Sequence, residues 1–369
     1  MPDSAPTQIS EHRFPCDTCG ADMRFDPGDD RLICDHCGAT EAIDHGPWTR
    51  SAAVKELDFN TAVKAGLGTA EMEEARVTPC PNCGAKVEFD TAQHAAECPF
   101  CATPVVTDTG TSRQIKPRAV LPFMLEEENA RAAMTDWLGA LWFAPNGLRE
   151  YARKGRKMTG VYTPCWTFDA DTKSAYRGQR GTVYYESKTV TRNGKTERVD
   201  VPKVRWTPVK GRVARFFDDV LIVASTALPD PFRKALVHWD LTRLEPYQPE
   251  YLAGFRAEAY TIELQDAFAE ARAIMDRQIL RDVRFDIGGD KQRVDDIDTA
   301  ISEVTFKHIL VPVWVAAYRY RGRAFRFVVN GQSGQVVGER PWSAWKIAFA
   351  VLAGLIMAAM VGYLYGTGQ

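Results

Sequence analysis

The chain lacks a nucleotide-binding loop. Gly194, Lys195 and Thr196 match the end of a Gly-x-x-x-x-Gly-Lys-Thr pattern, but Thr189 stands where its first glycine is required. Such a loop also lies between a strand and a helix, whereas this run interrupts alternating residues typical of a hairpin tip. No other Gly-x-x-x-x-Gly-Lys run occurs. The sequence therefore excludes an ATP-driven motor.

Other absences bear on the localisation of the protein and on whether it is an enzyme. Residues 1–13 contain no apolar run, so we expect no secretory signal peptide and a disordered start. The histidines form no His-Glu-x-x-His pattern, and His238 and His308 follow no metal-ligand spacing. Cys165, between Pro164 and Trp166, is expected to be a small buried apolar residue. The preferred interpretation is a protein that is not an enzyme; a membrane-bound hydrolase using Cys165 or His308 is a weaker alternative.

Eight of the nine cysteines form two matched frames. In each, one Cys-x-x-Cys pair is separated from the next by fourteen residues. Four thiolates in a closed tetrahedral shell are typical of structural zinc, and redox or disulfide chemistry would not require two matched sets. We therefore expect two zinc ribbons, over 14–47 and 78–107, and a reducing compartment. The predicted ligands are Cys16, Cys19, Cys34 and Cys37 of the first ribbon and Cys80, Cys83, Cys98 and Cys101 of the second.

The far end of the chain predicts one membrane span. From Ile347 to Tyr365 it has no charged residue, which at about 1.5 Å per residue is enough to cross a bilayer. Trp342, Trp345 and Lys346 precede this segment, as interfacial belts and the positive-inside rule place them. The sequence predicts a transmembrane helix over 345–365 and a tail-anchored, single-pass protein of the bacterial inner membrane with its N-terminal domains in the cytoplasm.

Small residues recur every four positions along the predicted span. This pattern lets a second helix approach closely, so a membrane-resident partner or a homo-oligomer formed through the span is expected. The stripe consists of Ala350, Gly354, Ala358 and Gly362.

Charge is distributed unevenly. The net charge of −2 combines −11 over the first 108 residues with about +9 over the rest. Both ribbons are acidic, which disfavours phosphate contacts and hence nucleic-acid binding. The positive part is predicted to lie beside the bilayer, where anionic lipid attracts lysine and arginine. One basic run is a candidate lipid contact: Arg149, Arg153, Lys154, Arg156 and Lys157.

The rest of the chain predicts an α+β fold. Residues 48–77 read as a helical linker that packs on either ribbon, 108–117 as a polar connector, and 118–341 as the main domain. This domain is interpreted as a duplication in which a helix (Leu125–Phe143; Tyr260–Arg281) precedes an antiparallel sheet. Type I′ hairpins are predicted at Asn193-Gly194 and Asn330-Gly331. Arg284–Asp296 is predicted to be a loop at the helix exit that departs from the calcium-loop pattern.

Several motifs resemble a known family. They include Leu141-Trp-Phe-Ala-Pro-Asn146, Tyr162-Thr-Pro-Cys-Trp-Thr-Phe-Asp169, Phe217-Asp-Asp-Val-Leu221 and Ile287-Gly-Gly-Asp290. They are similar to bacterial zinc-ribbon membrane proteins that carry the label primosomal protein N-prime (replication factor Y), superfamily II helicase. More loosely, the chain resembles TFIIB-type zinc-ribbon membrane proteins that work beside SPFH-domain and phage-shock proteins.

The resemblance implies a membrane-resident partner and supplies no catalytic residue. The helicase label requires ATP-binding and Asp-Glu-x-His motifs that the chain does not contain. We therefore expect a zinc-binding adaptor or assembly protein with two structural Zn²⁺ ions, its ribbons held off the main domain. The alternative is a nucleic-acid-associated protein of the replication-restart type.

Overall fold

The computed structural model describes residues 14–43, 55–88, 95–106, 111–143, 158–192, 195–236, 238–320, 323–339 and 342–367. The predicted disordered start, the basic run 149–157 and the Asn193-Gly194 turn lie outside these residues.

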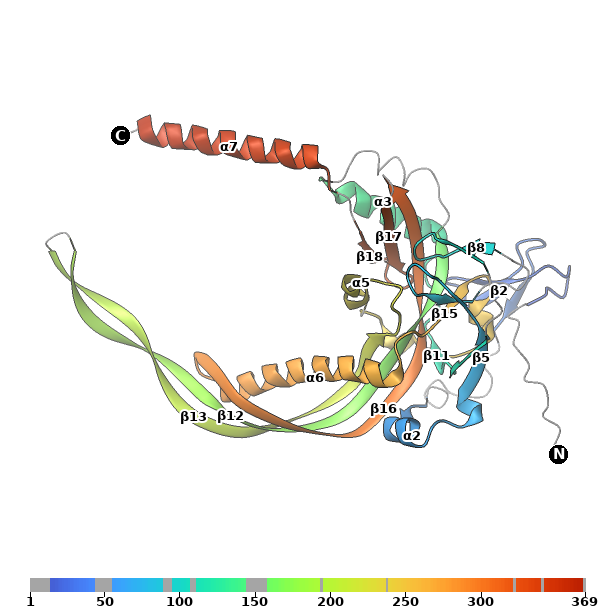
Figure 1. Cartoon of the computed structure of the whole chain (residues 1–369), viewed down its shortest axis with the longest axis horizontal. Helices are drawn as coiled ribbons and strands as arrows, with labels where there is room; N and C mark the ends of the chain where they lie inside the picture. Colours follow the sequence, from blue (N-terminus) through green and yellow to red (C-terminus); the bar gives the residue numbers. More distant parts are fainter. Residues whose placement is uncertain are drawn as a thin grey trace.

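Three very long strands form the centre of the fold. They are β12 (Thr159–Arg192), β13 (Lys195–Val223) and β16 (Lys291–Tyr320), which pair antiparallel in the order β13-β12-β16 and curve together (Figure 1). On its other side β16 pairs with β17 (Arg323–Asn330), which pairs with β18 (Val336–Gly338). The expected mixture of helix and antiparallel strand is confirmed, but sheet dominates.

Beyond the third strand, β12 and β13 continue alone. β16 begins at Lys291, opposite Gly181, whereas β12 and β13 stay paired to Arg192 and Lys195. The resulting two-stranded ribbon, which we call the arm (residues 182–192 and 195–205), projects away from the rest of the chain (Figure 1). The hairpin predicted around residues 193 and 194 is thus confirmed in its two strands.

Helix α6 (Leu264–Ile287) lies along the concave face of the long strands (Figure 1). Its buried residues recur at helical spacing, so one stripe faces the sheet. They are Leu264, Ala267, Ala271, Met275, Ile279, Val283 and Ile287. These residues form one core with aromatic rings of β12 and β16, including Trp166, whose indole N–H donates to the Ile262 carbonyl at 3.0 Å.

The loop expected at 284–296 is much shorter than predicted. Helix α6 continues to Ile287 and β16 begins at Lys291, so Gly288–Asp290 alone connect them. Gly288 and Gly289 have φ of 65° and 75°, a conformation in which glycine carries no Cβ strain. The acidic residues from Asp295 onward belong to the strand.

Helix α3 (Glu127–Ala140) confirms the other predicted helix of the main domain. It buries Ala130, Met134 and Leu138, and Trp137 meets the Phe327 ring of β17 edge-on at 5.6 Å. Each of α3 and α6 therefore precedes long antiparallel strands. That the two halves are copies of one unit remains a prediction.

The hairpin predicted at Asn330-Gly331 has a different turn. Val329 pairs with Val336, so the connection is longer than a two-residue type I′ loop. The Asn330 carboxamide oxygen accepts from the backbone N–H groups of Gln332 and Ser333 at 2.8 and 2.9 Å, and Gly334 has φ of 74°. The turn is therefore stabilised by the Asn330 side chain, and not by a two-residue Asn-Gly loop as predicted.

The first ribbon packs on the main domain. Its strands β1 (Arg24–Asp26), β2 (Arg31–Ile33) and β3 (Thr40–Ala42) form a small antiparallel sheet. The Phe25 N–H donates to the Ala253 carbonyl at 2.9 Å, and the Phe25 ring lies 5.3 Å from that of Tyr251. A Cβ on Gly254 would come within 2.8 Å of Arg24 Cβ, so glycine permits this close approach.

The first half of the second ribbon is part of the main sheet, whereas its strands β8 (Ala95–Glu97) and β9 (Pro104–Val106) form a separate two-stranded sheet. Its strand β7 (Lys86–Val87) pairs with β6 (Thr78–Pro79) and with β15 (Arg256–Ala259), and β15 runs parallel to β12 through Val161. Because the two ribbons share backbone pairing and core with the main domain, the expectation that they are held off it is wrong.

The segment between the ribbons also joins the main domain. Only α2 (Phe59–Lys64) is helical in residues 55–77, apart from one 3₁₀ turn at Thr69–Glu71. The Phe59 ring lies 4.4 Å from Phe268 of α6. The linker was expected to pack on a ribbon, but its apolar side chains pack against the core between α6 and the long strands.

Short elements complete the fold. The remaining strands are β4 (Leu57–Asp58), β5 (Met72–Arg76), β10 (Thr111–Ile115), β11 (Ala119–Val120) and β14 (Glu245–Pro246). The remaining helices are α5 (Asp230–Ala235) and the 3₁₀ turns Leu241–Arg243 and Pro249–Leu252.

The last element, α7 (Ala344–Thr367), projects from the body of the protein (Figure 1). Its segment Ala344–Tyr363 has a mean hydropathy of 2.1 and none of this segment is buried. Among the described residues it is the one helix long and apolar enough to cross a bilayer.

Candidate metal centres

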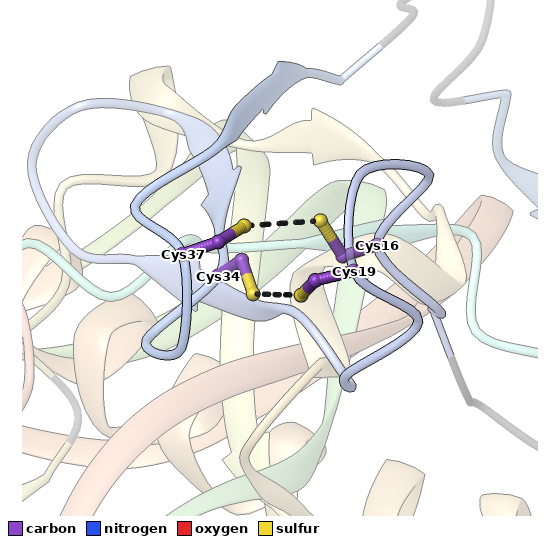
Figure 2. A group of neighbouring side chains, drawn as sticks. All are labelled: Cys16, Cys19, Cys34 and Cys37. Carbon is purple, nitrogen blue, oxygen red and sulfur yellow. Dashed lines mark hydrogen bonds between the residues drawn. The ribbon is translucent and has the colours of Figure 1, made fainter.

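The first cysteine frame converges on one point. The Sγ atoms of Cys16 and Cys37 lie 3.6 Å apart and those of Cys19 and Cys34 lie 3.5 Å apart, with all four within 4.8 Å of one another (Figure 2). A tetrahedral zinc with Zn–S bonds of about 2.3 Å would hold its sulfurs about 3.8 Å apart. The distances are too long for disulfides, and all four cysteines are free.

The backbone of each Cys-x-x-Cys pair folds into the same tight turn. Next to Cys16, the Gly20 N–H donates to the Cys16 carbonyl and the Cys16 N–H to the Ala21 carbonyl, both at 2.8 Å. Corresponding bonds recur at Cys34, Cys80 and Cys98. The residue after each pair has positive φ: 75°, 76° and 77° at Gly20, Gly38 and Gly84, and 52° at Ala102. Three of the four positions carry the residue that suits this conformation, and Ala102 does not.

The second frame has the same geometry in a more buried setting. Its Sγ atoms pair at 3.5 Å for Cys80 and Cys101 and at 3.6 Å for Cys83 and Cys98. Three of these residues are buried and Cys83 is half-buried, whereas in the first frame Cys19 and Cys37 are exposed. The two clusters therefore differ in solvent access.

The pKa shifts differ between the cysteines of each cluster. Backbone N–H groups of Thr18 and then Cys19 lower the pKa of Cys16 to about 7. The side-chain hydrogen bond with Cys98 lowers the pKa of Cys83 to about 5. The side-chain hydrogen bond with Cys83 raises the pKa of Cys98, burial raises that of Cys80, and the pKa values of Cys19 and Cys37 are also raised. Zinc binds the deprotonated form, so each cluster releases protons when metal enters. Four sulfurs at tetrahedral spacing leave no ligand position for water. The predicted ligands are thus brought together in two groups that can each hold one zinc ion.

A third cluster was not predicted from the sequence. The Lys307 ammonium lies 2.7 Å from Asp219 Oδ1, 3.1 Å from Glu56 Oε1 and 3.9 Å from Asp169 Oδ2. Burial raises the pKa of Asp169 to about 7. Asp169, Asp218 and Asp219 are close enough to suggest a cation site, but Lys307 already provides positive charge there. The arrangement is a buried ion-pair network at the point where the β12 register shifts between Phe168 and Ala170.

Cys165 and His308 do not form a catalytic pair. Cys165 lies opposite Ile309 and His308 opposite Trp166, so adjacent positions on antiparallel strands send the two side chains to opposite faces. Burial raises the pKa of Cys165 well above its usual value and lowers that of His308 to about 4. The expectation that Cys165 is a buried apolar residue is confirmed by its zero exposure.

The other candidate sites are also separated. His238 is exposed whereas His308 is buried, and within the described ranges no potential metal-ligand group includes a histidine. Lys195 and Thr196 begin strand β13, where a phosphate-binding loop would be followed by a helix. The small residues of α7 are on an exposed helix, and a Cβ on Gly354 or Gly362 would meet no atom within 4 Å.

Comparison with known proteins gives one relative of similar length. The chain is 26% identical over 262 residues to "Uncharacterized protein YdjG" of Bacillus subtilis (strain 168), covering 70% of this chain and 74% of the relative. No family profile matches the chain, and no solved structure matches it.

Proposed function

We propose that this protein is a membrane-anchored adaptor or assembly protein without catalytic activity, stabilised by two structural zinc ions. The observation that carries the proposal is α7, whose apolar segment has a mean hydropathy of 2.1 and contains no buried residue. An uncovered apolar helix of this length is stable in lipid rather than in water. Two sets of four free cysteines arranged as metal ligands favour a reducing compartment, which supports a location of the domains before α7 in the cytoplasm, at a bacterial inner membrane.

The metal centres support a binding role rather than a reaction. A closed shell of four thiolates offers zinc no open position for substrate or water. The acidic ribbons favour a protein partner over nucleic acid. By the resemblance described above, that partner is a membrane-resident protein of the SPFH or phage-shock type. The small residues of α7, at 350, 354, 358 and 362, would let its transmembrane helix, or a second copy of this chain, pack closely.

The arm limits how α7 enters the bilayer. Both project toward the same side of the molecule (Figure 1). The arm carries Glu186, Lys188, Lys203 and Arg205, and charged side chains at the bilayer centre cost at least about 2.5 kcal/mol each. The arm therefore stays in water.

Alkaline carbonate extraction of membranes tests the anchor. The full chain should stay with the membrane pellet, while Ala358→Arg, which adds about 3 kcal/mol to the cost of inserting the span, should shift to the soluble fraction. Ser343→Arg is the matched control, because residue 343 lies before the apolar segment and contacts Phe143 only through its backbone N–H. Extraction of the unmodified chain would contradict the anchor.

Purification in mild detergent, with zinc content and bound proteins measured together, tests the adaptor role. About two zinc ions per chain and membrane-resident partners are expected. Recovery of replication proteins or DNA that persists after nuclease treatment and at moderate salt would instead favour the replication-restart alternative.

A further inference from the structure

The end of α3 and the start of α7 contact each other, although they lie about 200 residues apart in the chain. The Ser343 N–H donates to the Phe143 carbonyl at 2.8 Å, and Lys346 Nζ donates to the Trp142 carbonyl at 3.1 Å. The rings of Phe143 and Trp342 lie 6.3 Å apart. The residues after α3 are thus placed where the apolar helix begins (Figure 1).

Exposed aromatic side chains gather at this contact. Trp142, Trp342 and Trp345 are 77%, 56% and 86% exposed, and they are the only exposed tryptophans in the part of the chain that the structure describes. Phe143 is 37% exposed. Tryptophan has a large apolar surface and one N–H donor, a combination that suits the boundary between headgroups and acyl chains.

Trp142 and Phe143 lie outside the packed face of α3. The apolar stripe of α3 is already occupied, because Ala130, Met134 and Leu138 are buried and Trp137 packs on Phe327. The backbone before the helix is fixed as well, since the Trp314 indole N–H donates to the Leu125 carbonyl at 2.8 Å. Helix α3 is therefore packed on the sheet, and Trp142 and Phe143 follow its end as exposed residues.

The amino-acid composition at the end of α3 is suited to contact with lipid. After Asp136, the residues from Trp137 to Phe143 carry no charge, and Lys346 adds a cation beside them. We infer that Trp142 and Phe143 lie in the headgroup region of the bilayer next to α7, as a second, non-spanning membrane contact. This inference rests on the proposed anchor and deepens it: two joined points of contact fix how the sheet and both metal centres are oriented over the membrane.

Photo-crosslinking in native membranes tests the inference. Benzoylphenylalanine replaces Trp142 in the full chain, and in a control it replaces Tyr185, which is 69% exposed on the arm. Irradiation should attach phospholipid to position 142, detectable as a mass increase of one lipid, and at least tenfold less to position 185. A protein adduct at 142, or no lipid adduct in chain that resists carbonate extraction, would overturn the inference while leaving the anchor intact.

Fluorescence provides a second measurement that does not depend on the unnatural residue. The full chain is reconstituted in vesicles of phosphatidylcholine and phosphatidylglycerol that contain lipids brominated near the glycerol. Trp142→Phe should lower the fraction of fluorescence that these lipids quench, whereas Trp206→Phe, in β13 at the base of the arm, should raise or preserve it. Equal quenching in the Trp142→Phe protein and the unmodified protein would place residue 142 away from lipid. If the unmodified chain washes off membranes with carbonate, the anchor itself fails and this inference falls with it.

Discussion

The imidazole of His308 lies against the indole of Trp166, its direct cross-strand partner, with ring centroids 4.9 Å apart. The ring of Tyr260 meets the same imidazole edge-on at 5.5 Å, and His308 Nδ1 donates to the Ile115 carbonyl at 2.7 Å. The histidine is only 1% exposed, so it is held as a neutral ring inside the core.

This burial predicts an acid-sensitive fold. The pKa of His308 falls to about 4 in the folded chain, whereas an unfolded histidine titrates near 6.5. Because the unfolded chain binds this proton first, stability should fall as pH falls from about 6.5 to 4, by roughly 3 kcal/mol in total. Urea unfolding of the full chain in detergent should show that His308→Gln loses less stability than the unmodified chain across this interval. Parallel pH profiles for the two proteins would rule out His308 as the source.

The ion-pair network around Lys307 should be costly to break. Lys307 is 6% exposed and faces carboxylates of Asp219, Glu56 and Asp169. In Lys307→Met these acids lose their cation, and the expected loss of unfolding free energy is about 3 kcal/mol. Arg177→Met is the matched control, since Arg177 pairs with Asp296 at 3.2 Å on the surface and should cost less than about 1 kcal/mol. Similar losses in both variants would refute a special role for the buried network.

The two metal centres should release zinc at different rates. In the first cluster Cys19 and Cys37 are exposed, whereas the second is buried within the main sheet apart from half-buried Cys83. A chelator should remove one zinc per chain at least about tenfold faster than the other, because the second centre needs local opening of the sheet. Cys37→Ser should abolish the fast phase and keep the slow one, as followed with a zinc indicator dye. Loss of the slow phase in that variant would reverse the assignment.

Ala102 offers a test of the tight turns. Its φ of 52° strains a residue with a Cβ, while Gly84 has φ of 77° at the matching position of the same ribbon. Ala102→Gly should raise the unfolding free energy of the zinc-bound chain by about 0.5 kcal/mol, as relief of strain outweighs added freedom in the unfolded chain. Gly84→Ala should lower it by about 1 kcal/mol. Destabilisation by both changes would show that the turn at 102 is not strained.

Local patterns in the sequence were sufficient for the metal clusters and the apolar helix. A Cys-x-x-Cys turn depends on a few consecutive residues, and the span depends on composition alone. Pairing between segments that are distant in the chain could not be predicted from the sequence. The pairing of Lys86 with Ala259 joins the second ribbon to the main sheet. Neither residue has a property from which this pairing could be predicted. Lys307 finds Glu56 for the same reason, across about 250 positions.

The length of the strands also escaped prediction. Strand β12 has 34 residues, several times an ordinary strand, and its polar, glycine-containing middle gave no reason to expect uninterrupted pairing. The segment Lys291–Asp296 was assigned to the loop predicted over Arg284–Asp296, because Gly288 and Gly289 indicate a helix exit and acidic residues follow them. It is a strand because the exposed side of a wide antiparallel sheet accepts such side chains.

The arm extends far beyond the rest of the sheet. Its eleven residue pairs beyond the end of β16 extend about 36 Å at about 3.3 Å per residue. The same strand, β12, runs without a break from the tip to Val161, which pairs with β15, and β15 pairs with the second ribbon. A force applied at the tip would therefore be transmitted along one hydrogen-bonded strand to the part of the sheet that β7 of the second ribbon joins, next to the second cysteine cluster.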